Sequence, residues 1–160
     1  MHPSTPATCD VCRQLRDADE HIVLARDQGV LAFIGERVRV PNSVFIAPLQ
    51  HCAGLHELEP GDLIALSTMV RLAARAIEAE INPDGLNVWW AFRPLAGQTD
   101  AHLLVEVVPR FVNVHYEYTD LSNVPSSTHA QRRATKERLL RSVQTTIEEK
   151  NGEHFRVVHQ

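Results

Sequence analysis

The alternation of hydrophobic and polar positions divides the chain into short strands and longer helices. Strand-like runs, each bounded by turn residues, cover residues 21–25, 29–34, 44–47, 86–92 and 101–110. From about residue 60 to 81, apolar side chains recur at three- and four-residue steps, which predicts an amphipathic helix that ends at Pro83-Asp84-Gly85. A second helix is expected from about residue 130 to 150, with a short edge strand at 155–158.

The run from Ala101 to Arg110 places polar groups on one face of a strand. Because residues two apart in a strand share a face, the first face carries His102, Leu104, Glu106 and Val108, and the second carries Leu103, Val105 and Val107. The second set is typical of a hydrophobic core. Burial of a histidine and a carboxylate on the first face requires a partner or a metal ion. We therefore expect a polar site along this strand.

Size and charge limit the classes of protein that fit. A chain of 160 residues is most simply one domain with its own core. The net charge of −4 argues against binding to nucleic acid. The polar, proline-rich N-terminal segment lacks a signal-peptide pattern, and no apolar run approaches membrane-spanning length. We expect a soluble, cytoplasmic protein that binds neither membranes nor nucleic acid.

The cysteines and two histidines suggest a metal site. Three cysteines do not form an even disulfide framework, and Cys9-x-x-Cys12, which opens a short helical segment, suits metal binding or redox chemistry. His51 and His102 lie at the ends of predicted strands, where loops can converge with this motif. Two thiolates and two imidazoles would form a closed tetrahedral zinc site that is neutral in total charge. The alternative is that the cysteines are surface thiols and backbone carbonyls satisfy both histidines.

Between Cys9 and Arg110 the chain resembles the histidine triad (HIT) superfamily. The matching segments are Cys9-x-x-Cys12, Val30-Leu31-Ala32-Phe33, Val44-Phe45-Ile46-Ala47-Pro48-x-x-His51, the helix after it, Gly85-Leu86-Asn87, Ala96-Gly97-Gln98 and His102-Leu103-x-Val105-x-Val107-Val108-Pro109-Arg110. The resemblance implies an α+β fold: an antiparallel sheet of about five strands with one long helix, followed here by a C-terminal helical extension. It also implies zinc ligation by Cys9, Cys12, His51 and His102, as in zinc-binding bacterial members.

The same resemblance implies that nucleotide chemistry has been lost. HIT hydrolases and transferases carry histidine-φ-histidine-φ-histidine, and the middle histidine attacks the α-phosphorus. Its position is Leu104, which has no lone pair to attack phosphorus and no proton to relay. The third histidine becomes Glu106, whose carboxylate repels a phosphate. Further departures are Gly35 at the acidic ribose-binding position and Ala91 and Arg93 at the asparagine and glycine positions, whereas Gln98 is retained.

The remaining candidate residues have two interpretations each. Glu106 is a candidate general acid or base, with a salt bridge to Arg93 or Arg110 as the alternative. The two arginines are also candidates for binding an anionic ligand. The predicted ligand-binding residues are Trp90, Arg93, Gln98, Leu104 and Arg110. Cys52 is a candidate reactive thiol, although an inert, partly buried cysteine is the expected outcome.

Three functional hypotheses follow. The leading one is a diverged, zinc-stabilised HIT-like protein that binds another small ligand, with an anionic ligand as a candidate, in the former nucleotide pocket, as a binding protein or an enzyme of altered chemistry. The second is a nucleotide hydrolase or transferase that acts through other groups. The third is an interaction protein that docks through the basic half of the C-terminal helix. We also expect a HIT-like domain at residues 1–112, an extension at 113–160, and a homodimer formed through the long helix and residues 86–92.

Overall fold

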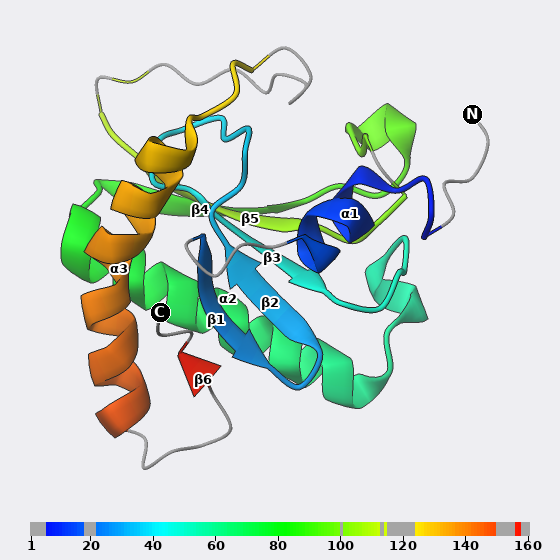
Figure 1. Cartoon of the computed structure of the whole chain (residues 1–160), viewed down its shortest axis with the longest axis horizontal. Coiled ribbons are helices and arrows are strands. Elements are labelled where there is room, and N and C mark those ends of the chain that lie inside the picture. Colours follow the sequence, from blue (N-terminus) through cyan, green and yellow to red (C-terminus); the bar gives the residue numbers. More distant parts are fainter. Residues whose placement is uncertain are drawn as a thin grey trace.

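The computed structural model describes residues 6–17, 22–99, 101–112, 114, 124–149 and 156–157. Strands in this part of the chain form one antiparallel sheet: β1 (Val23–Asp27), β2 (Val30–Phe33), β3 (Val44–Pro48), β4 (Gly85–Trp90), β5 (Val105–Arg110) and β6 (Arg156–Val157). The helices are α1 (Asp10–Arg16), α2 (Pro60–Ile81) and α3 (His129–Glu149), with short 3₁₀ turns η1 (Leu55–Glu57) and η2 (Pro94–Ala96). The strand order is β4-β5-β3-β2-β1-β6 (Figure 1). The predicted α+β fold is confirmed.

The two faces of the sheet are covered by different helices. On one face, α2 packs its apolar stripe, including Leu66, Met69 and Ile77, against strand residues such as Val105 and Val107. On the other face, α1 covers a smaller apolar cluster of strand residues: Val23, Leu31, Phe33, Phe45 and Ala47. Figure 1 shows the short α1 and the long α2 on opposite sides of the sheet. The alternation of residues 103–107 decides which side chains meet which helix.

Strand β5 begins later along the chain than the sequence pattern predicts. The sequence pattern starts a strand at Ala101, whereas β5 starts at Val105. The reason lies in the backbone hydrogen bonds of His102 and Leu103. The His102 carbonyl accepts a hydrogen bond from the Gln98 side chain (3.2 Å), and the Leu103 N–H donates to the Cys52 carbonyl (2.6 Å). These groups therefore bond to loops instead of to a neighbouring strand.

The C-terminal helix α3 packs on α2 through polar contacts with Glu80 and through the buried Leu139. Arg138 donates two hydrogen bonds to the Glu80 carbonyl (3.0 and 2.7 Å), and Arg141 and Ser142 donate to the Glu80 carboxylate (3.2 and 2.6 Å). The Ser142 hydroxyl and then Arg141 lower the pKa of Glu80. Leu139 is buried in the core with α2. Much of the basic half of α3 therefore serves contacts within the chain.

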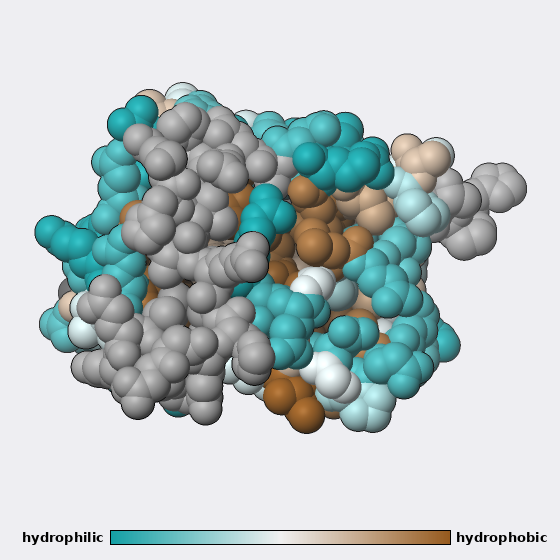
Figure 2. Space-filling model, turned by 60° about the horizontal axis from the view of Figure 1, so that its bottom comes forward, coloured by the Kyte–Doolittle hydropathy of each residue, from teal (hydrophilic) through white to brown (hydrophobic). Residues whose placement is uncertain are grey.

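One face of the molecule combines a polar edge with an apolar centre. Among the residues that Figure 2 colours, hydrophilic side chains lie mainly around the edge of this face and apolar side chains gather near its centre. None of the helices in the described part of the chain combines the length and the hydropathy of a membrane-spanning segment. The segment that joins β5 to α3 lies mostly outside the described residues.

Candidate metal centre and pocket

Helix α1 presents two thiols on the same side of the chain. Cys9 is the N-cap residue of α1, and its Sγ accepts a hydrogen bond from the Cys12 N–H (3.4 Å). Because residues three apart lie on one side of a helical turn, both sulfurs turn toward the sheet. Both side chains are buried.

Two histidines from distant loops meet these thiols. His51 follows β3 and His102 precedes β5. The Cys12 Sγ lies 3.2 Å from His51 Nδ1 and 3.3 Å from His102 Nδ1, and the Cys9 Sγ lies 3.7 Å from His102 Nδ1. All four donor atoms lie within 4.8 Å of one another. The structure thus brings together the four residues predicted as metal ligands.

A backbone contact fixes the role of His102. Its Nε2 lies 2.9 Å from the Pro48 carbonyl oxygen, which can only accept a hydrogen bond. The ring proton therefore sits on Nε2, and Nδ1 carries a lone pair directed at both sulfurs. His51 Nδ1 lies within reach of the Cys12 Sγ as well, so two thiols and two ring nitrogens converge on one small space. A metal ion between the four donors satisfies all of them, and the carbonyl contact is the outer-shell support typical of ligating histidines.

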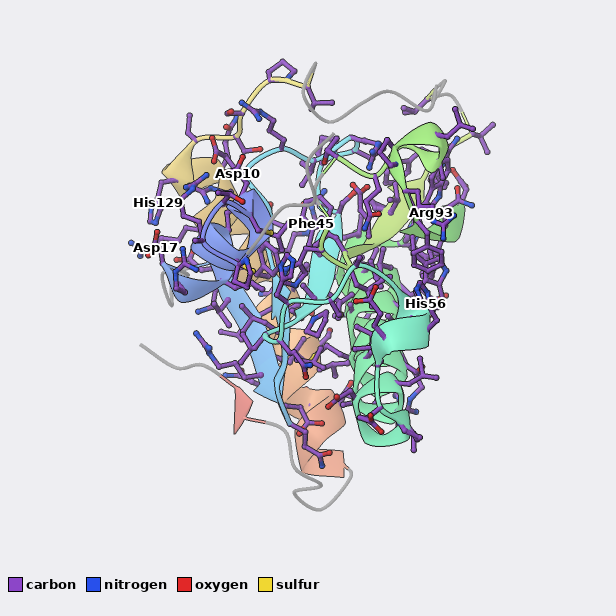
Figure 3. The ribbon with its side chains drawn as sticks, turned by 90° about the vertical axis from the view of Figure 1, so that its right-hand side faces the viewer. Asp10, Asp17, Phe45, His56, Arg93 and His129 are labelled. Atoms are coloured by element: carbon purple, nitrogen blue, oxygen red, sulfur yellow. The ribbon has the colours of Figure 1, made fainter. Side chains whose placement is uncertain are left out.

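Next to this cluster, a pocket of about 410 Å³ opens between α1 and the sheet. Its apolar wall consists of Val11, Phe33, Phe45 and Leu104, and its polar wall of Asp10, Arg13, Gln14, Glu36, Arg37 and Thr99. Arg13 pairs with Asp10 at 3.1 Å. Figure 3 shows Asp10 on α1 and Phe45 in the sheet, with Arg93 well apart from Asp10. The pocket therefore combines an apolar floor with a rim of both charges.

Glu106 lies behind this pocket in a buried ion pair. Its Oε2 accepts a hydrogen bond from the Arg39 guanidinium, and the two side chains are 4% and 7% exposed. Burial raises the pKa of Glu106, and the Arg39 charge and its hydrogen bonds oppose that rise. The second oxygen, Oε1, is buried without a hydrogen-bond partner among the described residues. The observed partner, Arg39, is neither of the two arginines considered from the sequence.

Comparison with known families shows where this arrangement belongs. A family model for the HIT domain matches residues 16–113, more than half of the chain. The chain belongs to the HIT family. Cys9 and Cys12 lie just before the matched range. The matched range therefore contains β1 to β5 and α2, and the cluster of two cysteines and two histidines joins this domain to α1.

Individual relatives are distant. The chain is 20% identical over 111 residues to an uncharacterised HIT-like protein of Mycoplasma genitalium. The aligned residues cover 69% of this chain and 79% of that protein. A zinc-bound histidine triad family protein of Mycobacterium smegmatis superposes with a TM-score of 0.73 at 18% identity, over 91% of this chain and 99% of that one. A HIT family protein of Bacillus anthracis gives 0.59 at 26% identity, over 89% and 96%.

The predicted ligand-binding residues of this HIT chain do not all meet in one place. Leu104 lines the pocket. Trp90 pairs in register with Val105, which faces α2, so Trp90 lies on the opposite face of the sheet. Arg110 pairs with Gly85 at the other end of β5 from Leu104. The exposed Arg93 lies in the turn before η2, outside the pocket lining.

Gln98 and Cys52 have structural contacts. The Gln98 amide donates to the carbonyls of Ala53 (2.8 Å) and His102 (3.2 Å) and accepts from the Arg93 N–H (2.7 Å), so it ties together the loops around His102. Cys52 is 2% exposed in the core beneath α2, and burial raises its pKa to about 11. The burial favours the inert interpretation of this thiol.

Sequence reasoning missed several residues of the pocket. From the sequence, Phe33 and Phe45 were interpreted only as core residues of strands. Arg39, the partner of Glu106 behind the pocket, lies in a loop without a motif. Phe45 has a specific relation to Gly35: a Cβ atom at Gly35 would lie 2.0 Å from two atoms of the Phe45 ring. The absence of a side chain at Gly35 was visible in the sequence. The bulky Phe45 in the following strand β3 was the signal that an aromatic ring could occupy that space.

Proposed function

We propose that the cluster of Cys9, Cys12, His51 and His102 binds a structural zinc ion. Zinc bonds of about 2.3 Å to sulfur and about 2.0 Å to nitrogen place tetrahedral S and N ligands about 3.5 Å apart. The S–N distances of 3.2, 3.3 and 3.7 Å bracket this value. Four protein donors leave no position open for a water molecule, which is the pattern of structural sites. The zinc-bound relative of Mycobacterium smegmatis supports the same assignment.

We further propose that the chain is a diverged HIT protein that binds a small ligand in the pocket and does not transfer nucleotides. The observation that carries this proposal is Leu104, which lines the pocket at the position of the nucleophilic histidine. An aliphatic side chain forms no bond to phosphorus. The protein then acts as a binding protein or as an enzyme of different chemistry.

Two features of the pocket support the proposal. The Phe45 ring lies against Gly35, where nucleotide-binding relatives are expected to carry an acidic ribose ligand, and an added Cβ would require Phe45 to move. A histidine at this position could carry positive charge for a phosphate. Glu106 cannot, and it is buried and paired with Arg39. The ribose contact and the phosphate contact are therefore both replaced.

Trapping a covalent intermediate tests this proposal. Wild-type protein and the Leu104→His variant are mixed with adenosine phosphoramidate, quenched, and measured by intact-protein mass spectrometry. We expect no nucleotidyl adduct on the wild-type protein, because the pocket holds no nucleophile at position 104. An adduct on a wild-type side chain would contradict the proposal, and its position would identify the nucleophile. The variant reports whether the rest of the pocket still admits the substrate.

A further inference from the structure

One oxygen of the Glu106 carboxylate is positioned to accept a hydrogen bond that no described residue supplies. Oε2 is used by Arg39, whereas Oε1 is buried and without a partner in the described part of the chain. A buried, charged acceptor without a donor is costly. Glu106 therefore holds a strong acceptor that none of the described residues uses.

Phe45 and Leu104 cannot provide this donor, and the indole N–H of Trp89, the third neighbour in the sheet, does not bond to Oε1. In the sheet register, Phe45 and Trp89 lie directly across from Glu106 on the two neighbouring strands, and Leu104 precedes it by two residues on the same face. Cross-strand partners lie close together. Phe45 and Leu104 have no polar side-chain atoms. These two side chains also form part of the pocket wall, so Glu106 lies directly behind the apolar floor of the pocket.

The charges around the pocket balance. The rim carries Asp10 and Glu36 against Arg13 and Arg37, and Glu106 is balanced by Arg39. Dianionic phosphate recognition normally uses an excess of positive charge or several converging donors. A neutral body with an N–H donor suits this wall better than an anion does.

Resting on the proposed ligand pocket, we propose that its ligand is a small, uncharged, ring-sized molecule with an N–H donor that bonds to Oε1 of Glu106. The apolar body packs against Phe33, Phe45 and Leu104. To reach Glu106 the donor must pass Phe45, whose ring lies over Gly35, where the absence of a Cβ atom leaves the ring its space. Glu106 thus accepts a hydrogen bond from the ligand at the position that the resemblance assigns to the third histidine of the triad.

Two probes of equal shape separate this proposal from simple hydrophobic binding. Benzamide carries N–H donors and no charge, whereas benzoate has the same ring and only acceptor oxygens. Each is titrated into ¹⁵N-labelled full-length protein, and amide shifts of Phe33, Phe45, Leu104 and Glu106 are followed. We expect benzamide to bind at least about tenfold more tightly than benzoate, the factor for a hydrogen bond to a charged group.

The Glu106→Gln variant is expected to abolish the preference for benzamide. The guanidinium of Arg39 only donates, so the glutamine oxygen must face it and the amide NH₂ takes the place of Oε1. That NH₂ can donate to a benzoate oxygen or to the benzamide carbonyl, so it no longer selects the probe that carries N–H donors. The matched control is Glu36→Gln, the same substitution on the pocket rim, which should keep the wild-type preference.

The outcomes separate this proposal from the function on which it rests. Equal binding of both probes at the pocket, or tighter binding of benzoate to the wild-type protein, overturns the role of Glu106 and leaves the pocket proposal standing. Absence of shifts at all pocket residues with both probes overturns both. The comparison of the two probes on the wild-type protein needs no variant, so it stays decisive if Glu106→Gln does not fold.

Discussion

At the scale of single residues, Leu104 and Glu106, which the resemblance places at two histidine positions, determine the chemistry in and behind the pocket wall. Leu104 contributes apolar surface to the pocket, and Glu106 forms a buried pair with Arg39. A buried ion pair adds little net stability compared with apolar residues, but removal of one partner leaves a costly uncompensated charge. The pair therefore makes Arg39 essential for the fold near the pocket.

The variant Arg39→Met tests the pair through its pH dependence. We expect a loss of about 3–5 kcal/mol in the free energy of unfolding near pH 7. The pKa of Glu106 in the folded variant should rise further, because Arg39 is the group that opposes its burial. A folded-state pKa above the unfolded value means that the folded state binds more protons, so stability falls as pH rises through that interval.

The loss for Arg39→Met should accordingly be smaller near pH 5 than near pH 7, where the carboxylate is ionised. Urea unfolding of wild type and variant at both pH values measures it. Arg37→Met, which removes an exposed arginine from the pocket rim, is the control and should show a small loss that does not depend on pH. An equal loss for Arg39→Met at the two pH values would argue against the charged pair.

At the scale of elements, α1 depends on the metal cluster. An isolated helix of seven residues is too short to be stable in water. Its attachment consists of the apolar contacts of Val11 and Leu15 and of the two thiols at its start. The helix also forms one wall of the pocket. We therefore expect the proposed zinc ion to hold α1 in place and, through α1, to fix one wall of the pocket.

Substitution of a ligand cysteine should release both the metal and α1. Purified wild-type protein should hold about one zinc ion per chain by elemental analysis, and Cys9→Ser should hold much less, because a hydroxyl is a poor zinc ligand. Hydrogen exchange of amides 10–16 should become much faster in Cys9→Ser, while that of α2 stays slow. Cys52→Ser, a buried thiol outside the cluster, is the matched control and should retain the metal. A metal-free wild-type protein would contradict the zinc proposal.

The elements themselves were largely predictable from the sequence. The strands and α2 follow from hydrophobic periodicity, and the Cys-x-x-Cys motif is a local signal that marks α1. The start of β5 was not predictable, because the Gln98 side chain and the Cys52 carbonyl divert its backbone. The partner of Glu106 was not predictable either, since nothing in the local pattern says that the loop with Arg39 folds back onto β5.

At the scale of the whole molecule, the edge of the sheet next to α2 is the surface for the proposed homodimer. Strand β4 is the edge strand of the described sheet, and its Val88 and Trp90 are 42% and 41% exposed. Both pair with β5 residues that face α2, so they lie beside that helix. Exposed apolar side chains on an unpaired edge favour pairing with a second copy.

Light scattering after gel filtration tests the dimer. The wild-type protein should have about twice the chain mass of 18.0 kDa, and Trp90→Lys should shift it to the mass of one chain. Exposed Ile64→Lys on α2 is an informative second variant, because it maps how far the interface extends along the helix. A wild-type protein of single-chain mass at micromolar concentration would contradict this prediction.

The account rests on the proposal that this HIT protein keeps a zinc site and does not carry out nucleotide chemistry in its pocket. The most direct measurement is the multiple-turnover rate of zinc-loaded wild-type protein on adenosine phosphoramidate and diadenosine triphosphate. We predict no turnover above the buffer rate with either substrate. Turnover that co-elutes with the purified protein and persists in Leu104→Ala would contradict the claim and would show that other groups carry out the reaction.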